Sequence, residues 1–160
     1  MHWLTDGKQK TKMSRQNSTY AEFLTKLPDT ATYEKPTQEK INDIRNEFRS
    51  LFNVGLPDDY IEFLHCTNGL SYDGRSICGV YDEVFLAEYP RKKSMDIIRS
   101  NSSFRDTTDI TDYILLGKSS IDHIVYNISE KKYQILSNGT MERFGSFDSF
   151  IELLYSFYEV

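Results

Sequence analysis

The chain has 160 residues, a net charge of −5 and an aromatic content of 14%, which fit one self-supporting domain and are not typical of a disordered chain. Its two cysteines are too few for a disulfide framework. Because neither a signal peptide nor a long apolar run is recognisable, we expect a soluble, cytoplasmic protein.

The chain divides into a polar arm and one predicted domain. Residues 1–17 are polar and rich in Lys and Arg, which indicates a flexible N-terminal arm. Residues 18–160 form the predicted domain, which opens with helices at about residues 20–27, 37–53 and 57–67. In the third helix an apolar stripe recurs at helical spacing, and Gly69 can take the left-handed conformation that closes the helix. The stripe consists of Tyr60, Phe63 and Leu64.

Strands dominate from residue 70 onward. Residues 70–72 and 76–80 are predicted to pair as a hairpin around Asp73-Gly74. Further strands are predicted at 113–117, 121–128, 132–136 and 141–144, and their short connections require an antiparallel meander. Before them, residues 94–100 indicate a short helix, and the Ser-, Asn- and Thr-rich stretch that follows is expected to be a loop. An amphipathic helix is predicted from about residue 146 almost to the end. This order predicts an α+β fold, an antiparallel sheet with helices packed against it.

The sequence offers no arrangement typical of an enzyme or a metal centre. His2, His65 and His123 are isolated from one another and from paired cysteines. His65 and Cys66 are neighbours, but adjacent residues on a helix do not face each other. A glycine-rich phosphate loop and a serine nucleophile elbow are both lacking in the sequence. We therefore predict a non-enzymatic protein with no catalytic residue, no metal and no cofactor.

Negative charge is concentrated in residues 56–90. This segment has seven acidic residues and one basic residue, Arg75. If the acids share a surface, they form a patch that speeds encounter with a basic partner and disfavours nucleic acid; an ordinary solvated face is the alternative. Aromatic residues are enriched in binding hot spots, although core positions also suit them. The predicted protein-binding residues are Asp73, Asp82, Glu83, Glu88, Tyr81 and Tyr89.

Several short motifs resemble, in their order, the signature of the SUKH superfamily, the Smi/Knr-type group named after yeast cell-wall regulators. They are Leu56-Pro57-x-x-Tyr60-x-x-Phe63-Leu64, Asn68-Gly69, Ile77-x-Gly79, Tyr113-Ile114-x-x-Gly117, Tyr126-Asn127 and Phe147-x-x-Phe150-Ile151. The resemblance covers about residues 37–157. Asn127 stands where the family more often has Asp, and residues 82–111 match no motif of the family.

The resemblance implies a single α+β domain with a central antiparallel sheet. Bacterial members resemble immunity proteins that neutralise toxins of contact-dependent or polymorphic systems, many of them nucleases. Fungal members resemble scaffolds in cell-wall signalling. The first hypothesis is an immunity protein that occludes the active site of a cognate, basic toxin; a regulatory scaffold is the alternative, and a small hydrolase is a third reading. We expect a protein partner, no nucleic acid and no membrane, and a chain that is a monomer or weak dimer.

Overall fold

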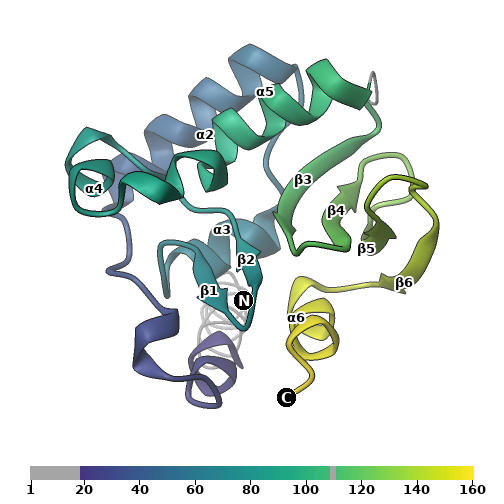
Figure 1. The fold of residues 1–160 in the computed structure, drawn as a ribbon. Helices are drawn as coiled ribbons and strands as arrows, with labels where there is room; N and C mark the ends of the chain where they lie inside the picture. The colour runs from purple at the N-terminus through teal and green to yellow at the C-terminus, as the bar shows by residue number, and fades with distance from the viewer. Residues whose placement is uncertain (1–18, 109–110) are drawn as a thin grey trace, which may run out of the picture.

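The protein has an α+β fold built on one antiparallel sheet (Figure 1). The computed structural model describes residues 19–108 and 111–160. Six strands follow one another across the sheet in chain order, and each neighbouring pair is antiparallel. The predicted α+β meander is therefore confirmed. The predicted arm at residues 1–17 lies outside the described residues.

The predicted elements occur in the predicted order, and a further helix and two 3-10 turns, which were not predicted, lie among them. The strands are β1 (Leu70–Tyr72), β2 (Arg75–Ile77), β3 (Tyr113–Lys118), β4 (Asp122–Asn127), β5 (Lys132–Ser137) and β6 (Arg143–Phe147). The helices are α2 (Gln38–Phe52), α3 (Asp58–Leu64), α4 (Glu83–Glu88), α5 (Ile97–Thr108) and α6 (Phe150–Tyr158), with 3-10 turns η1 (Asp29–Ala31) and η2 (Pro90–Met95). Residues 19–24 are also helical. Within the described ranges, no helix combines the length and apolar character needed to cross a membrane.

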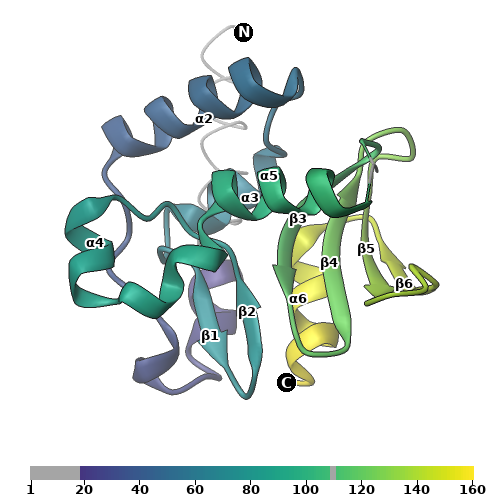
Figure 2. The same ribbon diagram turned by 45° about the horizontal axis from the view of Figure 1, so that its top comes forward.

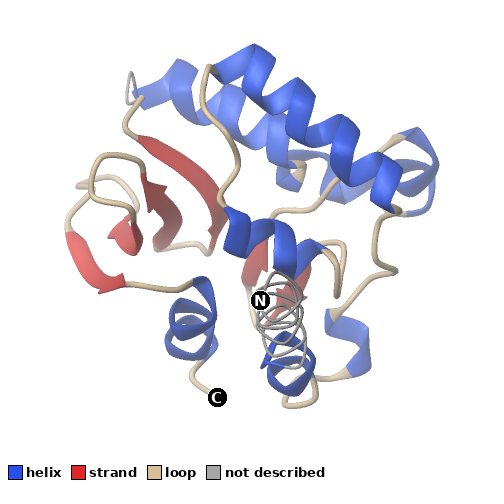
Figure 3. Ribbon diagram, turned by 180° about the vertical axis from the view of Figure 1, so that it is seen from behind, coloured by secondary structure: helices blue, strands red, loops and turns tan. Residues whose placement is uncertain are grey.

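Two apolar clusters occupy opposite faces of the sheet. On one face α3 and α6 meet, and the rings of Phe63 and Phe150 pack edge to face at 5.5 Å. On the other face Phe104 of α5 packs with Leu115 of β3. Successive strand residues point to opposite faces, so Ile114 joins the first cluster and Leu115 the second. Figure 2 shows α6 behind β3 and β4, and Figure 3 shows α2 running along the same side of the molecule as α5.

Local sequence signals place several element ends correctly. The Thr37 side chain accepts a hydrogen bond from the Lys40 N–H at 3.2 Å and caps α2. In the β1–β2 turn, Asp73 and Gly74 have φ values of 52° and 73°, as the predicted two-residue hairpin requires. The end of helix α3 was not predicted correctly, because the helix ends at Leu64, three residues before the predicted end. Its predicted inward stripe is fully buried and consists of Tyr60, Phe63 and Leu64.

Two predictions about individual elements were wrong. The polar stretch after residue 100 is the C-terminal part of α5 rather than a loop. Its helix is fixed by Asn101, whose fully buried side chain hydrogen-bonds both the N–H and the C=O of Leu115 in β3. Helix α6 begins at Phe150 rather than near residue 146, because Phe147 still belongs to β6 and pairs with Tyr133.

A clasp formed by Asn68, Gly79 and Val80 joins the end of α3 to the end of β2. The Asn68 side chain donates to the Val80 C=O at 2.8 Å and accepts from the Val80 N–H at 2.6 Å. A Cβ at Gly79 would lie 2.6 Å from the Asn68 Oδ1 and 2.5 Å from the Tyr81 ring. Glycine is therefore the residue that allows the Asn68 side chain to reach the backbone of the next strand.

We expect Gly79→Ala to destabilise the protein by about 1–3 kcal/mol, because the added methyl overpacks this clasp. Equilibrium urea unfolding would measure the change. Gly55→Ala is the matched control, since the atoms nearest to a Cβ there all belong to the flexible end of the Arg49 side chain. Equal unfolding free energies for the two variants would contradict the role given to Gly79.

Candidate functional site

Residues 82–95 leave the sheet as one excursion between β2 and α5. Its base is closed by backbone hydrogen bonds from the Gly79 N–H to the Met95 C=O at 3.1 Å and from the Ile97 N–H to the Gly79 C=O at 2.9 Å. The Tyr81 N–H also donates to the Asp96 carboxylate at 3.0 Å. Figure 1 shows α4 at a corner of the molecule, near one end of α2. Four of the six predicted binding residues lie in this excursion.

Asp82 holds α4 in place. Its carboxylate caps the helix by accepting from the Phe85 N–H at 2.8 Å, and it forms an ion pair with Lys40 of α2. The hydrogen bond from Lys40, and then that from the Phe85 N–H, lower the pKa of Asp82. The charge of this residue is therefore largely compensated within the protein, and its role is structural.

Glu83 and Glu88 project from the exposed side of α4 together with Val84, whose side chain is 80% exposed, and Ala87. We name these four residues the α4 face. Neither glutamate forms an ion pair with another described residue. The α4 face therefore presents two uncompensated negative charges beside exposed apolar surface.

The two predicted tyrosines differ in their surroundings. Tyr81 is a core residue, 6% exposed, whose ring stacks on Phe85 at 4.1 Å and whose hydroxyl donates to the Asn68 C=O. Its burial corrects the prediction that it is a surface anchor. Tyr89 is 37% exposed and packs against Tyr33 and Phe85 at the border of the α4 face. The negative charge of Glu88 raises the pKa of Tyr89. Because Tyr89 is partly exposed, its side chain can contact a partner.

Asp73 does not belong to the same surface. It lies at the tip of the β1–β2 hairpin, where its carboxylate accepts from the Arg75 guanidinium at 2.9 Å. Figure 2 shows this tip at the end of the hairpin, well away from α4. The predicted set is therefore split, because the fold separates two segments that are close in sequence.

A groove between α2 and the base of α4 adds acids that the sequence prediction did not include. It has a volume of about 370 Å³, and Asp43 and Glu47 line it from α2 together with Asp82 and Asp96. Burial raises the pKa of Asp96, although hydrogen bonds from the backbone oppose this effect. The signal for Asp43 and Glu47 was their four-residue spacing on one side of a predicted helix, but only the fold places that helix beside α4.

The carboxylates on these surfaces do not form a metal centre. No group of three or more His, Cys, Asp or Glu side chains is placed to hold a metal ion within residues 19–108 and 111–160. The acids of the groove are also interspersed with two cations, Lys40 and Arg99. What the arrangement offers chemically is charge complementarity to a basic surface.

Comparison with known proteins bears on the fold alone. No protein-family model matches the chain, and no curated protein matches it. Among solved structures, the chain is similar to a protein from Pseudomonas syringae pv. tomato known by its crystal structure, with a TM-score of 0.58 and 14% sequence identity. The match covers 84% of this chain and 92% of the other. At this identity the likeness establishes a shared α+β architecture across most of both chains.

We expect Lys40→Met to raise the pKa of Asp82 only part of the way to its usual value, because the Phe85 N–H remains bonded to the carboxylate. An NMR titration of side-chain carboxyl shifts would measure the change. Folding lowers the pKa of Asp82, so the Asp82 carboxylate stabilises the folded protein at pH values above its pKa in the unfolded chain. This stabilisation is lost as the pH falls through its pKa in the folded protein. The loss of folding stability at low pH should therefore be smaller in Lys40→Met. Lys26→Met is the control, and an unaltered Asp82 titration in Lys40→Met would contradict the pairing.

Proposed function

We propose that this protein is a non-enzymatic, cytoplasmic immunity protein that binds a cognate basic toxin and occludes its active site. The proposal rests on the resemblance to the SUKH superfamily and on the surface charge of the described residues. The partner's class follows from the resemblance, whereas the surface that meets it follows from the charges.

The family-like motif positions have structural roles in this fold. Asn68 and Gly79 form the clasp, Gly69 adopts a φ of 80°, and Tyr60 donates a buried hydrogen bond to the Cys78 C=O at 2.6 Å. Residues that build the shared fold are poor candidates for recognising a particular partner. This supports placing the binding surface in the excursion at residues 82–95, where the motifs are absent.

The observation that carries the proposal is the uncompensated negative charge of the α4 face. Glu83 and Glu88 flank the exposed Val84, and Asp43 and Glu47 continue the acidic surface across the groove onto α2. A toxic nuclease needs a basic groove for its substrate phosphates, and an acidic surface can compete for that groove. A stable interface buries about 1,600 Å² in total, so both α4 and α2 would have to contribute.

The function is tested by expressing this chain together with the product of the neighbouring gene. We expect the neighbouring product to arrest growth and this chain to restore it. A neighbour without toxicity, or toxicity that this chain does not relieve, would contradict the proposal. Recovery of a housekeeping enzyme as the stable partner would instead favour the regulatory scaffold.

The α4 face is tested by the double variant Glu83→Lys and Glu88→Lys. Reversing both charges should slow association with the toxin by about tenfold at low ionic strength, and the difference should shrink as salt screens the charges. Stopped-flow or surface plasmon resonance would measure the rates.

The control for this variant changes the same total charge elsewhere. Glu22→Lys with Glu142→Lys reverses two exposed glutamates outside the α4 face, one in the helix at residues 19–24 and one in the turn between β5 and β6. If both double variants slow association equally, the effect depends on net charge alone. The α4 face would then not belong to the proposed interface.

A further inference from the structure

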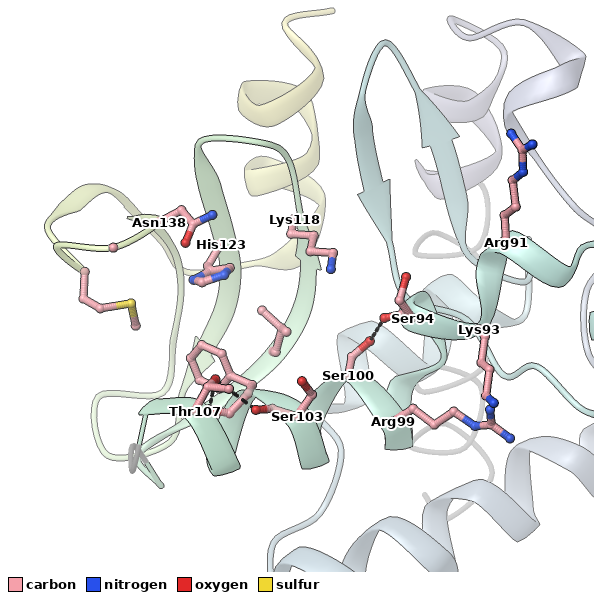
Figure 4. A pocket seen from close by; sticks show the side chains of 14 residues that line it. Arg91, Lys93, Ser94, Arg99, Ser100, Ser103, Thr107, Lys118, His123 and Asn138 are labelled. Carbon is pink, nitrogen blue, oxygen red and sulfur yellow. Dashed lines mark hydrogen bonds between the residues drawn. The ribbon is translucent and has the colours of Figure 1, made fainter.

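A pocket of about 710 Å³ opens on the sheet face opposite α6. Helix α5 forms one side of it with Ser103 and Phe104, and the strands contribute Leu115 and Lys118 from β3 and His123 from β4. The turn between β5 and β6 and the turn η2 close its two ends. In Figure 4 the side chains of Lys118 and His123 face the serine-bearing side of α5 across this space. The pocket has the size of ordinary small-molecule sites.

The charge of the pocket is opposite to that of the protein as a whole. No acidic side chain lines it. Four cations do, and they are Arg91, Lys93, Arg99 and Lys118. None of the four forms an ion pair with a described residue. Other cations of the chain, such as Lys40 and Arg75, do have such partners. On a chain with a net charge of −5, this is a local concentration of positive charge, in which Arg99 is partly compensated by Asp96 of the neighbouring groove.

The N-terminus of α5 does not account for this region. The first turn of the helix is capped by Asp96, which accepts from the Arg99 N–H at 3.1 Å and from the Tyr81 N–H at 3.0 Å. Asp96 lines the groove beside α2 and not this pocket. The positive potential of the pocket therefore comes from side chains on η2, α5 and β3, and not from a helix dipole.

Neutral hydrogen-bonding groups lie between the cations. The Ser103 hydroxyl makes no hydrogen bond to another described residue, and the buried Nδ1 of His123 has no partner within the described residues. Burial and the nearby Lys118 lower the pKa of His123, which favours the neutral ring. Phe104, Leu115 and Met141 give the pocket an apolar floor. The floor suits the uncharged part of a ligand, and the cations suit its charged part.

We propose that this pocket binds a phosphate-bearing small molecule of about nucleotide size, with Lys118 at its centre and the η2 cations at its end. Several spaced cations without acids match a polyanion better than a single carboxylate, since Lys and Arg donate charge-assisted hydrogen bonds to phosphate oxygens. The walls formed by α5 and the β5–β6 turn limit the ligand to a small molecule. This site is separate from the α4 face and does not depend on the identity of a protein partner.

Isothermal titration calorimetry of the full chain with ATP, ADP, pyrophosphate and adenosine, all without Mg²⁺, tests the proposal. We expect affinity to rise with phosphate number, adenosine not to bind, and binding to weaken with added salt. Lys118→Gln should weaken ATP binding by about tenfold or more, as the loss of a hydrogen bond to a charged group implies. Arg91→Gln with Lys93→Gln, on a different element, should weaken it independently.

Three outcomes would overturn the proposal. The first is no binding of ATP or pyrophosphate at about 1 mM, a concentration that would detect a binding free energy of only about −4 kcal/mol. The second is an equal loss of affinity in Lys26→Gln, a control at an exposed lysine outside the pocket. The third is tighter binding of a single-stranded oligothymidylate than of ATP with the same dependence on Lys118, which would assign the pocket to nucleic acid. Thermal melts confirm that each variant is folded, and the η2 variant keeps the test valid if Lys118→Gln does not fold.

Discussion

The pair of hydrogen bonds between the Asn68 side chain and the Val80 backbone fixes the arrangement on which both candidate sites depend. It joins the end of α3 to the end of β2, and it forms only because Gly79 carries no Cβ at the point where Asn68 crosses. Gly79 then bonds on its other side to Met95 and Ile97. One glycine thus connects three elements, and the excursion at residues 82–95 begins and ends at this connection.

The same connection separates the negative charges of the segment at residues 82–95 from its positive charges. Its first half forms α4, whose glutamates point to solvent beside α2, and its second half forms η2, whose cations Arg91 and Lys93 line the pocket. Lys92 lies between them and donates to Ser71 while its ammonium group sits over the Tyr33 ring. Charges a few residues apart in the chain therefore act on different surfaces. Summing the charge of residues 56–90 could not reveal this, because the sum stopped just before the cations.

The sequence predicted what local chemistry determines. The helix start near residue 37, the Asp73-Gly74 turn and the buried stripe around Phe63 all depend on residues within one turn of each other. It could not predict features that need distant partners. Residues 101–108 look like a loop because their polarity is high, yet Asn101 finds its hydrogen-bond partners in β3. Asp82 looks like a free surface acid until α2 brings Lys40 to it.

The value of a charged residue for recognition depends on what the fold leaves uncompensated. Asp73 and Asp82 were as prominent in the sequence as Glu83 and Glu88, but Arg75 and Lys40 neutralise the first two. Exposed pairs of this kind add little stability, but they do reduce the field that a partner meets. The charges left without an ion pair include the glutamates of the α4 face and the cations around Lys118, and these two groups have opposite signs. A partner that used both regions would need complementary charges of both signs, so a uniformly basic partner would contact the α4 face and not the pocket.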